Sequence, residues 1–523
     1  MELFPLGLVE DVEKGNPLAP SPTETHSTTG TTESSPPKWK KIYRATSAYL
    51  VSWKLEARGI QRVEAHERHS LQTLGFTQVG IVWFSMNLAA NNITLGMLGP
   101  VVFELGFLDA TLLAFFGQLV GNLAVGYQAM FGPRSGNRTL IVARYTMGWW
   151  PVKLIVLLNI VVMLGYSLID VVIAGQMLSA VSPHNSLSLV VGIIVTSLIT
   201  WTISTFGYRI FHYYERYAWL PQLIVLCVLA GVAGPKFDLS SESQGDARTI
   251  VGNRLSFFSL CLAAAITYSG AGADFFVYYP EHTAGWKVFA VTNAGLALSF
   301  TFMFILGIGL ASAIPTNTAW SDAYNSSQGA LIVEAYRPLG TFGSICSVMV
   351  ALGLVANLVP PAYSSGLDFQ ILGRWFEKVP RPIWNTLGIV IFTVCALAGR
   401  DHLAEIFTNF LALMGYWVVI WIAISLEEEF LFRPKMKTPD NDRGFDWTAW
   451  NEKDKLPHGY AALLAFLVGW AGAILSMAQL WYIGPLAAPV GDYGADMGNY
   501  VGFAWAALVF PPLRWLELKK FKR

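Results

Sequence analysis

The chain has 523 residues and no net charge, and 54% of its residues are hydrophobic against 13% charged, about half of the charged fraction of a soluble globular protein. This composition is typical of a membrane protein, and the neutral charge balance excludes nucleic acid as a partner. The four cysteines lie far apart in apolar stretches without a CxxC pair, so they predict neither a disulfide framework nor a metal site.

The chain begins with a polar segment. Residues 1–45 are rich in Ser, Thr, Pro and Glu, which cannot bury a core, and we expect a disordered cytoplasmic tail there. Residues 46–75 alternate charged and apolar side chains and predict an amphipathic segment on the cytoplasmic side of the membrane. No charged-then-apolar signal opens the chain, so the first span is expected to act as its own signal.

Twelve apolar stretches follow, each long enough to cross a bilayer as a helix. They lie near residues 76–98, 105–130, 152–180, 187–207, 217–234, 255–279, 287–314, 342–370, 382–399, 403–425, 459–483 and 498–516. Of the 35 Lys and Arg residues, 30 fall in the N-terminal tail, the even-numbered connections and the C-terminal end. Because positive residues favour the cytoplasmic side, both termini are predicted to be cytoplasmic. The sequon at Asn325 would then face outside, and the one at Asn137 would face inside.

The first span carries an unusually polar middle. Its four polar side chains at mid-depth are Ser85, Asn87, Asn91 and Asn92. A bare amide in hydrocarbon costs several kcal/mol unless a neighbouring helix, a water-lined cavity or a bound solute satisfies it. We interpret this stretch as an interrupted helix at a transport site; the alternative is that the amides only hold neighbouring helices together.

The sixth span resembles the first, because Gly270, Ala271 and Gly272 lie in its second half and glycine disfavours a helix interior. Two interrupted spans, five apart, predict an all-α membrane protein with two inverted five-helix repeats, the leucine-transporter arrangement. The repeats would cover 76–234 and 255–425 within a transport core of 76–425. A cytoplasmic loop at 426–458, two peripheral helices within 459–516 and a cytoplasmic end at 517–523 would complete the chain.

The third span carries an amide, a phenol and a carboxylate on one stripe. Asn159, Tyr166 and Asp170 fall within about 40° of one another around a helix. A carboxylate inside a membrane indicates a functional site: it can accept a hydrogen bond from the N–H of a bound ring, or take a proton. The alternative is a buried carboxyl held by a neighbouring helix, with Tyr166 as its donor.

In the eighth span, Asn357 is followed by Pro360 and Pro361 and then by Ser364 and Ser365. Proline interrupts the helical hydrogen bonds, and carbonyls freed in this way can bind a cation together with hydroxyl groups. The alternative is that the two prolines only kink the span. Gln176 and Asp274 lie near span ends, where water is expected to reach them.

Enzyme motifs are missing from the sequence. GAGADF lacks the third glycine and the preceding strand of a dinucleotide loop, and GPRSGN lacks the Lys-Ser/Thr of a phosphate loop. Without a nucleophile–base pair, a metal cluster or an ATP-binding motif, we expect neither an enzyme nor an ATP-driven pump, and no cofactor.

Four segments carry a resemblance to a known family: residues 59–63 (GIQRV), 131–137 (FGPRSGN), 214–216 (YER) and 273–275 (ADF). There, and over nearly the whole chain from residue 59, the sequence resembles the fungal purine-cytosine permeases, a branch of the nucleobase–cation symporters. The resemblance implies two inverted five-helix repeats plus two helices, and proton-coupled uptake of cytosine, adenine, guanine or hypoxanthine at the plasma membrane. It also implies substrate-binding roles for Ser85, Asn87, Asn357 and Pro360.

The chain departs from this family at the site itself. Nucleobase carriers of the family typically have Trp and Asn in the third span where this chain has Tyr166 and Asp170, and Asn where it has Leu358 and Pro361. An ionised carboxylate only accepts hydrogen bonds, so it favours a cargo rich in N–H groups or positively charged. The same family contains fungal pyridoxine (vitamin B6) transporters.

We therefore predict a proton-coupled symporter that imports a small nitrogen heterocycle, foremost a nucleobase such as cytosine or a purine, with sodium left open as the coupling ion. The alternatives are a transporter of pyridoxine or a related cationic heterocycle, and a sensor that binds its solute without moving it. The expected substrate-binding residues are Ser85, Asn87, Tyr166, Asp170, Asn357 and Pro360, with Asn159, Gly270 and Gly272 as further candidates. Asp170 is favoured as a ligand of the solute over a role as proton carrier.

Overall fold

The computed structural model describes residues 59–68, 75–182, 186–206, 208–437 and 441–523. Side chains are not described at residues 206, 208–218, 404 and 406–408. The predicted disordered tail, most of the amphipathic segment and the side chains of residues 214–216 therefore lie outside the described part of the chain.

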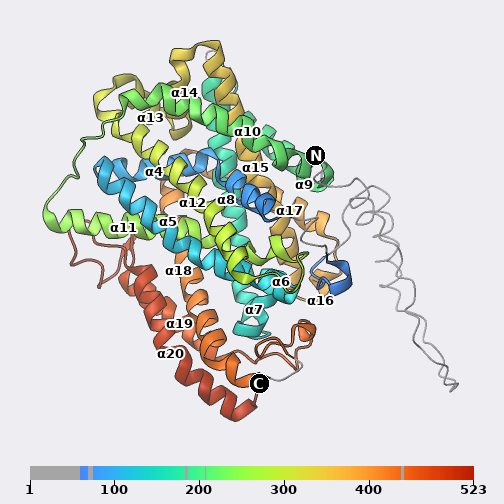
Figure 1. The fold of residues 1–523 in the computed structure, drawn as a ribbon. Helices are drawn as coiled ribbons and strands as arrows, with labels where there is room; N and C mark the ends of the chain where they lie inside the picture. Colours follow the sequence, from blue (N-terminus) through green and yellow to red (C-terminus); the bar gives the residue numbers. More distant parts are fainter. Residues whose placement is uncertain (1–58, 69–74, 183–185, 207, 438–440) are drawn as a thin grey trace, which may run out of the picture.

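Long helices form the body of the molecule (Figure 1). The predicted first repeat contains α3 (Phe76–Asn87), α4 (Ala90–Val101), α5 (Phe107–Ala129), α8 (Val152–Val181), α9 (Leu189–Phe206) and α10 (Tyr208–Ala233). The predicted second repeat contains α11 (Ala247–Ile266), η4 (Thr267–Phe276), α12 (Gly285–Ser312), α15 (Thr341–Ile371), α17 (Arg381–Gly399) and α18 (Leu403–Glu427). The last two long helices, α19 (Tyr460–Ser476) and α20 (Gly498–Phe521), pack against each other and against α18.

Shorter elements connect the long helices. The short α-helices are α6 (Phe131–Ser135), α7 (Thr139–Met147), α13 (Thr318–Ser326), α14 (Gln328–Tyr336) and α16 (Arg374–Glu377). Single helical turns are η1 (Ala65–Glu67), η3 (Gly234–Lys236), η5 (Ile314–Thr316), η6 (Arg337–Leu339), η7 (Arg400–His402), η8 (Glu428–Phe432), η9 (Arg433–Met436) and η10 (Trp447–Ala449). Strands β1 (Ala478–Gln479) and β2 (Tyr482–Ile483) form a small antiparallel hairpin between α19 and α20.

Within the described residues, eight helices are long and apolar enough to cross a membrane: α5, α8, α10, α11, α12, α15, α17 and α18, several of them with the turns that follow. The apolar helices α9 and α19 are shorter, and the first span is divided between α3 and α4. The protein is therefore a multi-pass membrane protein, while the count of twelve spans stays a prediction.

Both predicted interruptions are present. The first span leaves the helical conformation at Leu88 and Ala89, whose ψ angles are 57° and 146°. The sixth span changes from the α-helix α11 to a run of ten residues in the tighter 3-10 form, which includes Gly270 and Gly272. Polar residues in the first case and glycines in the second make the α-helix less favourable at these points.

The eighth span forms one continuous helix. Helix α15 runs from Thr341 to Ile371 and continues through Pro360 and Pro361, so the prolines do not divide the span. A proline has a backbone angle compatible with a helix, and tight packing in a membrane bundle tolerates the lost hydrogen bonds. Ser365, expected near a cation, donates its hydroxyl to the carbonyl of Ala362 over 2.9 Å.

On the side predicted to be cytoplasmic, ion pairs tie the helix ends together. Arg433 and Arg514 each donate to the buried carboxylate of Glu428 over 2.8 Å. Arg134, from the FGPRSGN segment, pairs with Glu429 over 2.8 Å. These contacts join α6, α20 and the turns that follow α18.

Candidate functional site

The interruption of the first span exposes backbone carbonyls that side-chain amides from other helices satisfy. Asn357, at the centre of α15, donates its amide to the carbonyl of Met86 over 2.5 Å. Gln222 of α10 donates to the carbonyl of Leu88 over 3.1 Å. A carbonyl buried in a membrane bundle needs such a donor, so these two amides hold α3 and α4 in their divided form.

Two side-chain amides of the first span itself also donate to backbone carbonyls near the interruption. Asn92 donates to the carbonyl of Asn87 over 2.9 Å, and Asn87 itself donates to the carbonyl of Trp83 over 3.1 Å. The Oδ1 atom of Asn87 is buried and has no hydrogen-bond partner among the described residues. Ser85 is buried on the same turn of α3. One acceptor of Asn87 therefore remains for a ligand at the interruption.

Aromatic side chains line the same region. Trp83 of α3 lies against Phe275 of η4, with ring centroids 4.7 Å apart, and its ring is 6.2 Å from that of Tyr268. The ring centroids of Tyr166 of α8 and Tyr268 are 6.4 Å apart. Rings from α3, α8 and η4 thus meet beside the two interrupted spans, and such surfaces stack on a planar heterocycle.

The hydroxyl group of Tyr166 already has protein partners. It lies 2.9 Å from the hydroxyl of Thr267 and 3.3 Å from the carbonyl of Ala264. Both partners belong to the junction between α11 and η4. Tyr166 therefore binds the interrupted sixth span with its hydroxyl, and its ring remains for stacking.

Asp170 is the least satisfied polar side chain of the region. It is 0% exposed, and neither carboxylate oxygen has a hydrogen-bond partner of good geometry among the described residues. The side chain that faces it is Asn91, whose Oδ1 atom already accepts from the N–H of Asn92 over 2.8 Å. The alternative of a carboxyl held by the hydroxyl of Tyr166 does not apply, because that hydroxyl bonds to Thr267.

The structure brings most of the predicted residues together. Tyr268 connects them, because it is within electrostatic range of Asp170 and within hydrogen-bonding reach of Asn357. Asn357 in turn contacts the interruption that carries Ser85 and Asn87. Pro360 is buried in α15, one turn beyond Asn357.

Asn159 and the two glycines lie elsewhere. Asn159 donates to the carboxylate of Asp368 over 2.8 Å, and a Cβ atom added to Gly270 would come within 2.0 Å of its Oδ1 atom. A Cβ atom added to Gly272 would meet the backbone of α5, 3.0 Å from the carbonyl of Val125. These three residues therefore serve close packing around the sixth span.

The sequence analysis did not single out three residues that contact the interruption or the predicted residues: Gln222, Tyr268 and Asp368. Gln222 and Asp368 were detectable as polar residues in apolar spans, but both lie within a few residues of a predicted span end. Asp274 was also predicted to lie near a span end that water reaches. It is half-buried, and its carboxylate accepts hydrogen bonds from the N–H and the hydroxyl of Thr139 over 2.7 and 2.9 Å. Its partial exposure agrees with the expectation that water reaches Asp274, and its carboxylate also caps α7.

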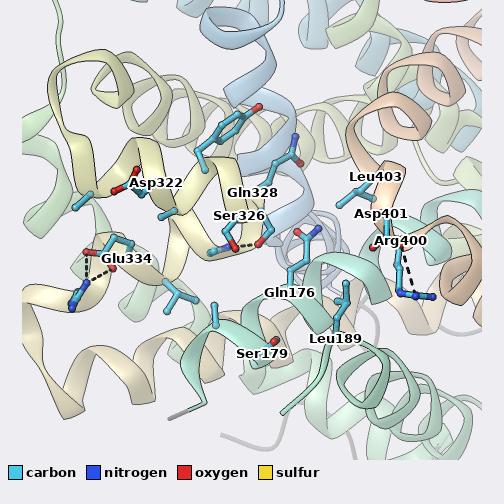
Figure 2. A pocket seen from close by; sticks show the side chains of 18 residues that line it. Gln176, Ser179, Leu189, Asp322, Ser326, Gln328, Glu334, Arg400, Asp401 and Leu403 are labelled. Atoms are coloured by element: carbon cyan, nitrogen blue, oxygen red, sulfur yellow. Dashed lines mark hydrogen bonds and ion pairs between the residues drawn. The ribbon is translucent and has the colours of Figure 1, made fainter. Parts of the chain in front are cut away.

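A separate cavity of about 800 Å³ lies between the end of α8, the helices α13 and α14, and the turn before α18 (Figure 2). Its walls come from the connections after the third, seventh and ninth spans, all of which are predicted to be outside. Gln176, expected near water, lies on this cavity.

Comparison with known proteins agrees with this architecture. A family model described as a permease for cytosine/purines, uracil, thiamine and allantoin matches residues 63–494. The vitamin B6 transporter TPN1 of Saccharomyces cerevisiae is 32% identical over 514 residues, which cover 90% of this chain and 88% of that protein. The purine-cytosine permease fcyB of Emericella nidulans is 32% identical over 518 residues, which cover 98% and 99% of the two chains.

A solved structure shares the fold. Mhp1, described as a nucleobase-cation-symport-1 family transporter in a closed conformation with bromovinylhydantoin bound, superposes with a TM-score of 0.64 at 14% identity. The match covers 88% of this chain and 96% of Mhp1. The expected fold class, with two inverted five-helix repeats, is confirmed.

Proposed function

The chain belongs to the family of permeases for cytosine/purines, uracil, thiamine and allantoin, and from this premise we propose that it imports a small nitrogen heterocycle together with a proton. It is a secondary transporter of the membrane, not an enzyme. The family membership leaves the cargo and the coupling ion as the open questions.

One observation carries the proposal: the carboxylate of Asp170 is fully buried beside two interrupted helices, faces Asn91, and has no hydrogen-bond partner of good geometry among the described residues. An unsatisfied buried acceptor is costly, so the cargo or a proton must satisfy it during transport. The free Oδ1 of Asn87 supplies a second acceptor, and the rings of Tyr166 and Tyr268 supply stacking surfaces.

A nucleobase is the first candidate cargo. Cytosine and adenine carry an amino group, and every purine carries a ring N–H group, so each can donate to Asp170 or to Asn87. Trp83, Tyr166 and Tyr268 offer aromatic faces of the size of such a base. The 32% identity to the purine-cytosine permease fcyB over nearly the whole chain supports this candidate.

Pyridoxine is the second candidate, and Asp170 favours it specifically. A buried carboxylate without a well-aligned protein donor can form a charge-assisted hydrogen bond with a protonated pyridine ring, about twice as strong as a neutral one. The 32% identity to the vitamin B6 transporter TPN1 supports the same cargo.

A proton fits the coupling role better than sodium. A cation held at the interruption would need its free carbonyls, but the carbonyls of Met86 and Leu88 accept from Asn357 and Gln222. Among the described residues, no group of three or more His, Cys, Asp or Glu side chains converges on a metal site. Asp170 and Asp368 are buried carboxyls that can take up a proton.

The transport cycle follows from this arrangement. The heterocycle binds between the interrupted first and sixth spans and the stripe of α8, and a proton binds with it. Movement of one helix group against the other then exchanges access from outside to inside. We place the protein in the plasma membrane with both termini in the cytoplasm, because positive residues concentrate in the connections on that side.

Uptake of labelled cytosine, adenine and pyridoxine in a fungal host without its own carriers tests the proposal. Accumulation against a gradient, abolished by a protonophore and insensitive to sodium, is the expected result. Asp170→Ala should abolish accumulation and Asp170→Asn should change the preference between cytosine and pyridoxine, while the matched change of an exposed acid away from both sites, Asp454→Asn, should leave uptake unchanged.

Two results would contradict the proposal. Saturable binding without accumulation would identify a sensor, and wild-type transport by Asp170→Ala would remove Asp170 from the site.

A further inference from the structure

The cavity between α8, α13, α14 and the turn before α18 has a volume of about 800 Å³, within the range of about 300–1,000 Å³ typical of small-molecule sites. It is separate from the site around Asp170. Figure 2 shows Gln176 and Gln328 near the middle of the view, between Glu334 on one side and Arg400 on the other.

Gln328, the first residue of α14, is the unusual side chain of this cavity. It is only 6% exposed, yet neither Nε2 nor Oε1 has a hydrogen-bond partner of good geometry among the described residues, although Tyr324 is adjacent. Leaving buried donors and acceptors unsatisfied destabilises the fold. A buried amide that lines a cavity without partners indicates a missing ligand or water.

Gln176 of α8 lies at the same wall. Its Oε1 atom accepts from the N–H of Gly329 over 3.2 Å. Gly329 must be a glycine for this contact, because a Cβ atom there would come within 2.8 Å of Gln176. The start of α14 therefore sits directly on α8, and the neighbouring residue, Gln328, is held at the cavity wall.

Three acids, Asp322, Glu334 and Asp401, and two arginines line the cavity. Arg337 pairs with Glu334 over 3.1 Å, and Arg400 lies 3.8 Å from the carboxylate of Asp401. Because four of these five charges form pairs, the buried amide of Gln328 is the group that can recognise a polar, planar solute. A glutamine amide presents a donor beside an acceptor, the pattern that pairs with the edge of adenine in two hydrogen bonds.

The cavity and the core site lie along the same helix, α8. Gln176 follows Asp170 by six residues on this helix, which is about 9 Å along its axis. The cavity also borders connections predicted to be outside, so it lies on the outer side of Asp170.

We propose that this cavity is an outer binding site, in which Gln328 and Gln176 hold the heterocycle before it enters the core site. This inference rests on the proposed function, since it takes the cargo class from it. The outer site raises the local concentration of cargo, so it acts on apparent affinity, whereas Asp170 acts on transport itself.

Binding stoichiometry and uptake kinetics test the outer site on the full-length protein. Purified wild-type protein in detergent is expected to bind two molecules of labelled cytosine or pyridoxine per chain. Gln328→Leu should bind one and raise the KM of uptake about 3- to 10-fold with Vmax within twofold. Asp170→Ala should also bind one molecule, but without transport.

Controls separate this inference from the proposed function. Gln244→Leu changes an exposed glutamine on the same predicted face and should bind two molecules with unchanged KM. Gln328→Glu, which keeps the size and the acceptor but removes the donor, replaces Gln328→Leu if the latter does not reach the membrane.

One molecule per wild-type chain, or an unchanged KM in both Gln328 variants, overturns the outer site while the proposed function stands. Failure of the wild type to bind or take up any of the three probes overturns both.

Discussion

Gln222 on α10 donates its amide to the carbonyl of Leu88, 134 positions earlier in the chain, over 3.1 Å. Through this hydrogen bond, a neighbouring helix satisfies a backbone carbonyl at the interruption between α3 and α4. Gly353 of α15 makes room for it, because a Cβ atom there would come within 2.3 Å of the Gln222 amide. The divided first span thus depends on a residue outside it.

The first prediction concerns this contact. Gln222→Leu leaves the carbonyl of Leu88 buried without a donor, which should cost about 1–3 kcal/mol and reduce uptake at least tenfold. Gly353→Ala should act in the same direction, by displacing the amide. Thermal melting of the purified protein and initial uptake rates measure both effects. Wild-type melting and uptake in both variants would show that the contact is dispensable.

The second prediction concerns Asn159 and Asp368, which bond over 2.8 Å between α8 and α15. Asn159→Ala and Asp368→Ala should each lower the free energy of unfolding by about 1–3 kcal/mol, and the double variant should cost little more than either single change. Melting temperatures of the four proteins in one detergent give the coupling. Strictly additive losses would mean that the two side chains act independently.

The third prediction concerns Gly270. A Cβ atom there would lie 2.0 Å from the Oδ1 atom of Asn159, so Gly270→Ala must displace Asn159 or η4 and should abolish uptake. Gly231→Ala is the matched control, because nothing lies within 4 Å of a Cβ at that position of α10. The control should transport normally and gain up to about 1 kcal/mol of stability from better helix propensity. Normal uptake by Gly270→Ala would contradict the packing described for η4.

The fourth prediction concerns Glu428, which accepts from Arg433 and Arg514 in a buried cluster. Glu428→Ala leaves the buried guanidinium of Arg433 without a carboxylate and that of Arg514 with Glu517 alone, and it should cost about 3–5 kcal/mol, seen as a large drop in folded yield. The exposed pair between Glu452 and Lys455 provides the control, since Glu452→Ala should cost less than about 1 kcal/mol. Equal effects of the two changes would contradict the role of burial.

The fifth prediction concerns pH. Burial raises the pKa of Asp496, in the connection before α20, to about 6, although Tyr416, Gln479 and the N–H of Gly498 donate to its carboxylate. Because the folded-state pKa is the higher one, the folded protein binds this proton more tightly than the unfolded chain. The stabilisation that comes from protonated Asp496 is complete below about pH 4 and is lost as the pH rises through about 6.

Asp496→Asn removes this titration. Between pH 4 and pH 7, the melting temperature of the wild type should fall relative to that of Asp496→Asn, with a difference of at most about 3 kcal/mol in the free energy of unfolding. Melting curves at four or five pH values check the sign. Parallel profiles, or a wild type that gains stability with rising pH, would contradict the assignment.

The sequence predicted the interruptions of the first and sixth spans because their causes are local. Amides at mid-depth and glycines in a helix disfavour the α-helix wherever they occur. The stripe of the third span was predicted in part. Tyr166 and Asp170 lie at the site, but Asn159 bonds to Asp368, because the 11 residues from Asn159 to Asp170 extend about 16 Å along the helix and reach a different depth.

Hydrophobic length and the distribution of Lys and Arg by themselves predicted a multi-pass membrane protein, and the polar residues at mid-depth predicted a transport site. These sequence features act through the bilayer and through the chemistry of single side chains, so none of them depends on how the helices pack. Only the tertiary structure decided which polar groups are already satisfied. Asn357 and Gln222 are occupied by backbone carbonyls, whereas Asp170 and Gln328 are not. The carbonyls of Met86 and Leu88, which Asn357 and Gln222 satisfy, become available only because α3 and α4 separate there. The helices that supply the two amides are distant in sequence.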